Sequence, residues 1–216
     1  MNAGILGTGT VGRTIGSRLI ELGHRVRLGG RSAANERAIA WAASEGERAS
    51  SGTFADAAAF GEIVFNCTEG AHSIEALTAA GRGHLAGKVL VDVANPLEPG
   101  PGRRAPLLFC NNDSLGERIQ AAFPEARVVK TLNTMWCGLM VNPRLLGAPH
   151  VVYMCGNDAG AKSEVAALLG AFGWRDEEIL DLGDIAASRG TEMFLPLWLL
   201  LYGRLGTASF NFTIVR

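Results

Sequence analysis

A glycine-rich stretch near the N-terminus constrains the fold more than any other part of this chain. Residues 5–16 read ILGTGTVGRTIG and contain a G-x-G-x-x-G spacing at Gly7, Gly9 and Gly12. The stretch follows the apolar run of residues 3–6 and opens a segment of helical periodicity that ends at Gly23. A predicted strand, tight turn and helix in this order are typical of dinucleotide-binding βαβ units. The alternative is a plain strand–turn–helix whose glycines meet steric needs alone.

Each of the three glycines has a distinct predicted role. Gly7 allows the sharp turn, Gly9 lets a pyrophosphate approach the backbone, and Gly12 lets the helix pack closely on the strand. The N-terminus of the helix favours an anion, because its first amides have no partner within the helix and its dipole is positive there. The amides expected to face the phosphates belong to Thr8, Gly9, Thr10 and Val11.

The end of the second predicted strand indicates which dinucleotide is bound. Sites for NAD carry an acidic residue about 20 positions after the glycines, where it binds the ribose hydroxyls. The segment RLGGRSAANER has no carboxylate between residues 28 and 35, and it places Gly30, Arg31 and Ser32 at the strand's end. A guanidinium and a hydroxyl suit a 2'-phosphate, so we predict NADP rather than NAD. The alternative is that Arg31 is a solvated surface charge and the site does not discriminate.

Strand-like and helix-like segments alternate along most of the chain. Further strands are expected at residues 24–31, 62–67, 88–94, 127–132, 150–155 and 177–182. Helices are expected from Ser114, with an S-L-G-E capping pattern, to before Pro124, and over residues 162–173. This order predicts an α/β fold with a doubly wound, mainly parallel sheet of Rossmann type.

The organisation is expected to change near residue 184. Residues 1–183 are predicted to form the NADP-binding domain. Residues 184–216 are predicted to form a short C-terminal helical extension, interrupted at Pro196, and an extended tail. The extension would pack on the same domain or on a second subunit, so a homodimer is expected.

Composition excludes several classes of protein. The net charge of -1 gives no indication of a nucleic-acid partner. The four cysteines form no C-x-x-C pair and there are four histidines, so neither a zinc site nor a disulfide framework is expected. The chain begins without a signal-peptide pattern, and its most apolar run, residues 193–203, is too short to span a bilayer. We therefore expect a soluble, cytoplasmic protein with free thiols and no membrane partner.

The chain resembles the NADP oxidoreductases that depend on coenzyme F420, a 5-deazaflavin. Similar folds serve as the cytosolic domain of membrane metalloreductases. The resemblance rests on residues 5–32 and on the later segments VFNCTEGAHS, DVANPL, VKTLNTM and GTASFNF. The first segment is shared by many dehydrogenases. The combination of GGRS, a short chain and a C-terminal helix and tail is more specific to this family.

The resemblance implies a set of cofactor-binding residues. By position, NADP would be held by Thr8, Gly9, Thr10, Val11, Gly30, Arg31 and Ser32. Along the ribose and nicotinamide it would meet Cys67, Thr68 and His72, with Asn95 and Pro96 nearby. Asn133 would border the nicotinamide, at a position where the archaeal enzymes tend to carry histidine. This departure leaves the identity of the acceptor open.

No acid–base constellation stands out in the sequence, and no catalytic residue is assigned. Hydride transfer between a nicotinamide and a deazaflavin or flavin needs mainly close stacking of two rings, whereas reduction of a ketone or imine usually needs a proton donor. An apolar slot for the rings, or ordinary core, is expected from Met135, Trp136, Phe210 and Phe212. Arg103 and Arg104 are either solvated loop charges or contacts for an acidic acceptor.

Three functions remain open on this evidence. The first is an NADPH-linked oxidoreductase whose small-molecule acceptor is F420 or a flavin. The second is a small NADPH-dependent carbonyl or imine reductase. Larger relatives of that kind add a helical substrate domain, and only about 30 residues follow the predicted sheet here. The third is a non-catalytic NADP-binding sensor.

Overall fold

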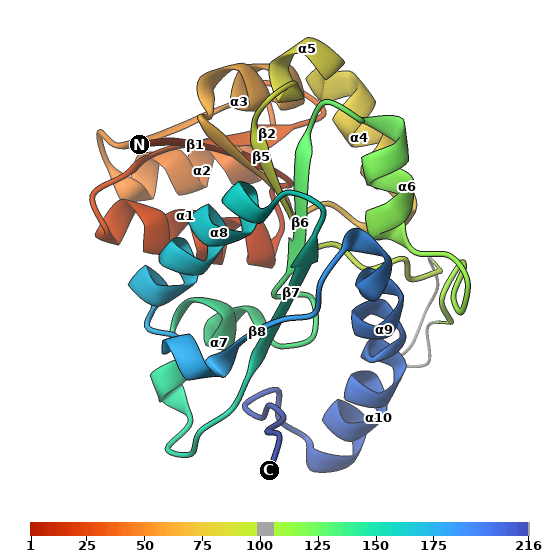
Figure 1. Cartoon of the computed structure of the whole chain (residues 1–216). Helices are drawn as coiled ribbons and strands as arrows, with labels where there is room; N and C mark the ends of the chain where they lie inside the picture. The colour runs from red at the N-terminus through yellow and green to blue at the C-terminus, as the bar shows by residue number, and fades with distance from the viewer. Residues whose placement is uncertain (99–105, 216) are drawn as a thin grey trace.

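The chain folds around one eight-stranded sheet with helices on both faces (Figure 1). The computed structural model describes residues 1–98 and 106–215. The strands lie in the order β3-β2-β1-β4-β5-β6-β7-β8. Their bounds are β1 Asn2–Leu6, β2 Arg25–Gly30, β3 Ala49–Thr53, β4 Ile63–Asn66, β5 Val89–Asp92, β6 Arg127–Thr131, β7 Val152–Gly156 and β8 Ile179–Asp181. All neighbouring pairs are parallel except β6 and β7, which are antiparallel. The predicted doubly wound, mainly parallel sheet is confirmed.

The strand order places a ligand crevice beside the glycine-rich turn. The chain runs outward from β1 through β2 to β3, and then returns to β4 on the other side of β1. In such sheets the connections leave on opposite faces at this point, and ligands bind in the crevice at the carboxyl ends of the strands. The turn after β1 and the loop after β4 both lie at that position.

Two clusters of apolar side chains, one on each face of the sheet, form the core. The helices have the bounds α1 Thr10–Glu21, α2 Glu36–Glu45, α3 Phe54–Phe60, α4 Ser73–Ala80, α5 Arg82–Leu85, α6 Leu115–Ala122, α7 Cys137–Val141, α8 Ala159–Phe172, α9 Ser188–Met193 and α10 Leu195–Leu205. One cluster includes residues of α1, α2, α7 and α8, and the other includes residues of α3, α4 and α6. The strands are covered on both sides, which explains why most of them are continuous apolar runs.

The region between β2 and β4 differs from the expectation. No strand is expected there from the sequence, but β3 closes that edge of the sheet and α2 and α3 flank it. The strand reads ASSGT, in which Thr53 is the one β-branched residue and no aromatic residue occurs, so its composition does not identify a strand. Its position follows from pairing with β2 and from the capping box of Thr53 and Asp56, which starts α3 immediately afterwards.

The C-terminal segment packs against the same chain. Helices α9 and α10 meet at Phe194, and Pro196 occupies the second position of α10, where a missing amide proton costs little. Residues 206–215 contain no strand, but the Val151 amide donates to the Phe212 carbonyl and so ties the tail to the start of β7. Within the two described ranges, none of the helices is both long and apolar enough to cross a bilayer.

Candidate functional site

A cleft of about 690 Å³ lies at the carboxyl ends of β1, β2 and β4. Eight of the predicted cofactor-binding residues line it: Gly7, Thr8, Gly9, Gly30, Arg31, Cys67, Thr68 and His72. They come from three separate parts of the chain, and the strand order brings them together. The cleft therefore lies in the crevice that the topology predicts for a ligand.

The three glycines differ sharply in their surroundings. A Cβ atom on Gly7, which has φ +121°, would lie 2.4 Å from the carbonyl oxygen of Cys67. On Gly12 it would lie 2.2 Å from the carbonyl oxygen of Gly7. On Gly9 it would meet no atom of the described residues within 4 Å. Gly7 and Gly12 thus serve the fold, whereas the backbone at Gly9 faces open space that a ligand can fill.

The start of α1 presents unpaired amides beside this space. Gly9 is the N-cap, no side chain caps the helix, and its first turn contains no acidic residue. A helix of 12 residues therefore begins with its free N–H groups and positive dipole end exposed to a ligand. Thr10 lines a second cleft, of about 580 Å³ between α1 and α7, and does not line the first. Val11 is partly buried and Gly12 is buried, so only their backbones remain available for a phosphate.

The end of β2 supplies the positive charge of the cleft. Arg31 is exposed, and it makes no hydrogen bond or ion pair with any residue in the described part of the chain. The Ser32 hydroxyl accepts from the Ala34 amide at 3.1 Å, and Ser32 is not among the residues that line the cleft. Arg37 lines the cleft with Arg31, and so does Glu36. The free guanidinium of Arg31 is suited to a phosphate.

The loop after β4 forms the other side of the cleft. Burial raises the pKa of the Cys67 thiol, and the charge of Asp92 raises it further, so the thiol is protonated at neutral pH. Thr68 is hydrogen-bonded through its hydroxyl to Asn66 at 2.6 Å. His72 lies at the end of a single 3-10 turn, with Nδ1 3.6 Å from the carboxylate of Glu75. The imidazole is largely exposed and makes no hydrogen bond with a described residue, so its contact with Glu75 orients it only loosely.

The predicted nicotinamide-side residues form a pair beside the cleft but do not line it. Asn95 donates from Nδ2 to the Asn133 carbonyl at 2.8 Å, and Asn133 donates from Nδ2 to Asn95 Oδ1 at 2.9 Å. Asn133 Oδ1 is buried without a hydrogen-bond partner among the described residues. The preceding residue, Leu132, has φ +64°, a conformation that is costly for leucine and held here by a fully packed side chain. Pro96 is buried behind the turn that carries His72.

Sequence reasoning missed several residues of the cleft. These are Ala34, Asn35, Glu36, Phe54, Glu69, Glu75, Ala76 and Ala79. Asn35 caps α2, and its side chain accepts from the Ala38 amide at 3.1 Å. The pattern N-E-R could have marked that helix start. Phe54 follows β3 directly, so it could not be placed while that strand was unrecognised.

The aromatic residues proposed for a ring-binding slot are dispersed. Met135 is buried in the core, and the ring of Trp136 covers Gly138. Phe210 stacks on Trp198 with 5.3 Å between ring centroids, and Phe212 packs edge-on against Phe194 at 4.4 Å. The tail aromatics therefore pack on the C-terminal helices. Arg103 and Arg104 lie outside the described residues.

The site offers phosphate-binding chemistry more clearly than metal or acid–base chemistry. Among the residues that the structure describes, no three His, Cys, Asp or Glu side chains gather as a metal site. The fit to NADP rests on the open backbone at Gly9, the uncapped start of α1 and the unpaired Arg31. The first two features favour the pyrophosphate of a dinucleotide, and Arg31 favours an additional phosphate.

Comparison with known proteins agrees with this geometry. Residues 2–96 match the family model described as NADP oxidoreductase, coenzyme F420-dependent. A crystal structure from Arthrobacter sp. FB24, of a protein proposed to be an F420-dependent NADP-reductase, is 52% identical. It superposes with a TM-score of 0.92 over 100% of this chain and 99% of that one.

Two further proteins are more distantly similar. Metalloreductase STEAP3 of Rattus norvegicus is 30% identical over 200 residues, which cover 91% of this chain and 36% of that protein. The chain thus spans about a third of the length of this curated relative. A reductive aminase from Aspergillus terreus, solved with NADPH4, cyclohexanone and allyl amine, is 21% identical. Its TM-score is 0.63 over 95% of this chain and 62% of that chain. Together with the full-length similarity to the Arthrobacter protein, the family match shows that this chain belongs to the coenzyme F420-dependent NADP oxidoreductases.

Proposed function

We propose that this protein transfers hydride between NADP(H) and a deazaflavin or flavin acceptor. The observation that carries the proposal is the cleft itself, which is lined by both the open backbone at Gly9 and the unpaired Arg31, two groups suited to the phosphates of NADP. Family membership supports the deazaflavin as acceptor. NADPH supplies the hydride when bound, and the acceptor ring takes it together with a proton from solvent.

The residues of this chain bind and orient the reactants. The amides at the start of α1 would hold the pyrophosphate, and Arg31 would hold the 2'-phosphate. Thr68 and His72 would lie along the ribose that carries the nicotinamide. The Asn95–Asn133 pair would border the nicotinamide from beneath the cleft, with Asn133 Oδ1 buried and without a partner among the described residues.

The positions of these residues account for the lack of an acid–base pair. The Cys67 thiol is held protonated, and the His72 imidazole makes no hydrogen bond with a described residue, so neither group is positioned to exchange a proton with a substrate alkoxide or amine. Transfer between two conjugated rings depends instead on holding them in contact at the correct orientation.

An acceptor screen tests the proposal. Purified protein is mixed anaerobically with NADPH and, in separate samples, coenzyme F420, FMN, or cyclohexanone with an amine. We expect NADPH absorbance to fall together with that of F420 or the flavin, one molecule for one. Turnover of the carbonyl or imine alone would make the protein a small NADPH-dependent reductase. Tight NADPH binding without any turnover would make it an NADP-binding sensor.

We also propose that the protein forms a homodimer through its C-terminal helices. The outer face of α10 exposes Leu197, Leu200 and Leu205 at 47%, 56% and 54% of their surface. An exposed leucine stripe on one helix is typical of a surface that packs against another subunit. Light scattering should give the mass of a dimer for the wild type and of a monomer for Leu200→Glu. A wild-type monomer at micromolar concentration would contradict the proposal.

A further inference from the structure

A buried polar network runs beneath the cleft and ends at Thr68. It connects the side chains of Lys130 on β6, Asp92 on β5 and Asn66 on β4, which lie on three adjacent strands. All three side chains belong to residues with 0% exposed surface. Such a network is costly unless each polar group is satisfied, so its hydrogen bonds can be traced without ambiguity.

Lys130, at the end of the network farthest from Thr68, sets which groups of the network donate hydrogen bonds and which accept them. Its ammonium donates to Asp92 Oδ2 at 2.8 Å, to Glu192 Oε1 at 2.9 Å and to the Ala94 carbonyl. Burial by itself would lower the pKa of Lys130, but the charges of Asp92 and Glu192 outweigh burial and raise it. The lysine therefore remains a cation with all three protons used, and both carboxylates act as acceptors.

Asp92 then fixes the orientation of the Asn66 amide. Asp92 Oδ1 lies 2.8 Å from Asn66 Nδ2, and a carboxylate can only accept there. The second proton of Nδ2 goes to Ser73 Oγ at 3.1 Å. The amide oxygen of Asn66 must consequently face Thr68, and the amide cannot be flipped without placing two acceptors in contact.

The Asn66 amide in turn fixes the Thr68 hydroxyl. Thr68 Oγ1 lies 2.6 Å from Asn66 Oδ1, so its single proton is donated to that oxygen. Ser73 Oγ lies 2.8 Å from Thr68 Oγ1 and 3.4 Å from the Glu69 carbonyl oxygen. Because the Thr68 proton is already used, Ser73 is the donor in the shorter contact. A hydroxyl has one proton and two lone pairs, so Thr68 retains one lone pair and no proton for a ligand in the cleft.

Because the Thr68 hydroxyl can accept but not donate, it can bind only a ligand group that donates a hydrogen bond. Phosphate oxygens accept hydrogen bonds, and a hydroxyl whose proton is already used cannot donate to them. A ribose hydroxyl can donate to the remaining lone pair. The strands β2 and β4 flank β1 on opposite sides, so Arg31 and Thr68 lie on opposite sides of the glycine-rich turn. If Arg31 holds the adenosine 2'-phosphate, Thr68 meets the other ribose.

We propose that Asp92 and Asn66 are positioning residues that fix the Thr68 hydroxyl as an acceptor for the nicotinamide-ribose hydroxyl of NADP(H). The inference rests on the proposed NADP-binding function and deepens it. It also gives a role to the C-terminal segment, because Glu192 on α9 completes the charge balance of Lys130 from outside the sheet.

Two ligands separate this role from a general effect on the fold. NADPH contains both riboses, whereas 2',5'-ADP contains the adenine ribose with its phosphates and lacks the nicotinamide ribose. Calorimetric titration of the full chain with each ligand gives two dissociation constants. We expect Thr68→Val to weaken NADPH about tenfold, the value of one hydrogen bond, and to leave 2',5'-ADP unchanged. Thr68→Ser should recover most of the loss.

The variants at Asn66 and Asp92 test the network itself. Asn66→Ala leaves the Lys130 ion pairs intact and releases the Thr68 proton, so NADPH affinity should fall several-fold while 2',5'-ADP affinity is kept. The double variant Asn66→Ala/Thr68→Val should bind no more weakly than Thr68→Val alone. Asp92→Asn should behave like Asn66→Ala if it folds. The matched control is Thr78→Val on the exposed face of α4, which should change neither constant.

The opposite results would overturn the inference. Equal weakening of NADPH and 2',5'-ADP by Asn66→Ala, or additive losses in the double variant, would show a structural effect only. Unchanged NADPH affinity in Thr68→Val would remove the proposed ribose contact. A wild-type protein that binds neither ligand would defeat the proposed function as well, and that failure is visible before any variant is made.

Discussion

Because Gly9 and Gly12 have different surroundings, alanine substitutions at the two positions should affect different properties. We expect one to weaken NADPH binding and the other to lower the stability of the fold. Gly9→Ala adds a Cβ that meets no protein atom within 4 Å, at φ −75° and ψ −176°, which any residue adopts. Alanine gains about 0.4–1 kcal/mol by restricting the unfolded chain, and it loses about the same as a poorer N-cap than glycine. We therefore expect a free energy of unfolding within about 1 kcal/mol of the wild type.

The same methyl group occupies the space proposed for the pyrophosphate. Loss of two amide-to-phosphate hydrogen bonds, at about 1.5–3 kcal/mol each, gives about 3–6 kcal/mol, or at least a hundredfold weaker NADPH binding. Gly12→Ala should show the opposite pattern, with its main effect on stability and not on NADPH binding. Its Cβ would lie 2.2 Å from the Gly7 carbonyl oxygen, so the helix must shift at a cost of about 1–3 kcal/mol.

Thermal unfolding and calorimetric titration measure the two effects on the same samples. A loss of 1–3 kcal/mol corresponds to a fall in Tm of about 2–12 °C for a domain of this size. Gly170→Ala on α8 is the matched control, because its Cβ also meets nothing within 4 Å and it lies outside the cleft. Wild-type NADPH affinity in a folded Gly9→Ala protein would refute the proposed phosphate position. An unchanged Tm in Gly12→Ala would refute the close packing.

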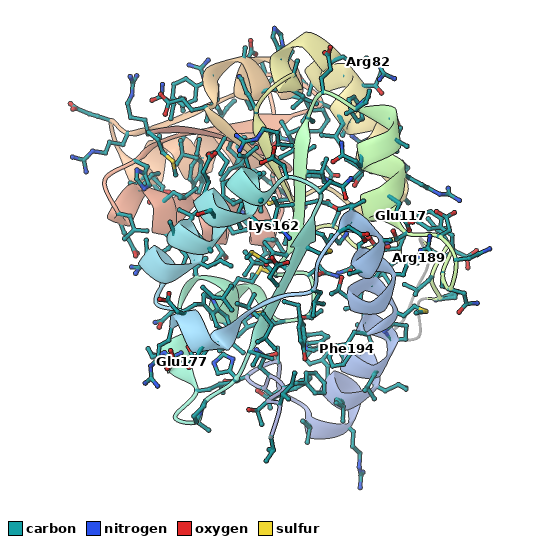
Figure 2. The ribbon with its side chains drawn as sticks, viewed as in Figure 1. Arg82, Glu117, Lys162, Glu177, Arg189 and Phe194 are labelled. Atoms are coloured by element: carbon teal, nitrogen blue, oxygen red, sulfur yellow. The ribbon has the colours of Figure 1, made fainter. Side chains whose placement is uncertain are left out.

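Two further predictions concern the joint between α6 and α9, where Figure 2 shows Glu117 and Arg189 side by side. Glu192→Ala removes one of the two carboxylates that pair with Lys130, and it also leaves two amides of α6 without an acceptor. Chemical denaturation should therefore show a free energy of unfolding lower by about 3–5 kcal/mol. A loss below about 1 kcal/mol would contradict this. The hydrogen bond from Arg189 lowers the pKa of Glu117 below its ordinary 4.5. The ion pair therefore stabilises the fold fully above pH 4.5, and this contribution is lost as the pH falls through the lowered pKa of Glu117 in the folded protein. Arg189→Gln should therefore flatten the decline in stability below pH 4.5, and an identical decline would show that the pair does not contribute.

The parts of the fold that the sequence predicted are those in which local pattern and burial agree. The strands over residues 62–67 and 88–94 are apolar runs buried on both faces, and the S-L-G-E pattern places a cap at Ser114. Even there the partner of Glu117 was not predictable. Its carboxylate bonds the Ser114 hydroxyl and Arg189, a residue 72 positions away, and does not return to the backbone of its own helix.

The elements that were missed depend on neighbours distant in sequence. The strand β3 is polar and becomes a strand by pairing with β2 at the edge of the sheet. The buried network of Lys130, Asp92 and Asn66 could not be predicted either. Its three residues are isolated polar positions on separate strands, and they can be recognised as one unit only once the strand order is known. The glycine spacing and Arg31 were found because their chemistry is local.

The relative affinity for NADPH and NADH tests the proposed 2'-phosphate contact most directly. Fluorescence titration of the wild type and of Arg31→Ala gives four dissociation constants. We expect the wild type to prefer NADPH, and Arg31→Ala to lose about 10- to 150-fold in NADPH affinity, as for one charge-assisted hydrogen bond, with little change for NADH. Equal affinities in the wild type, or equal losses for both nucleotides in the variant, would contradict an NADP site at the end of β2.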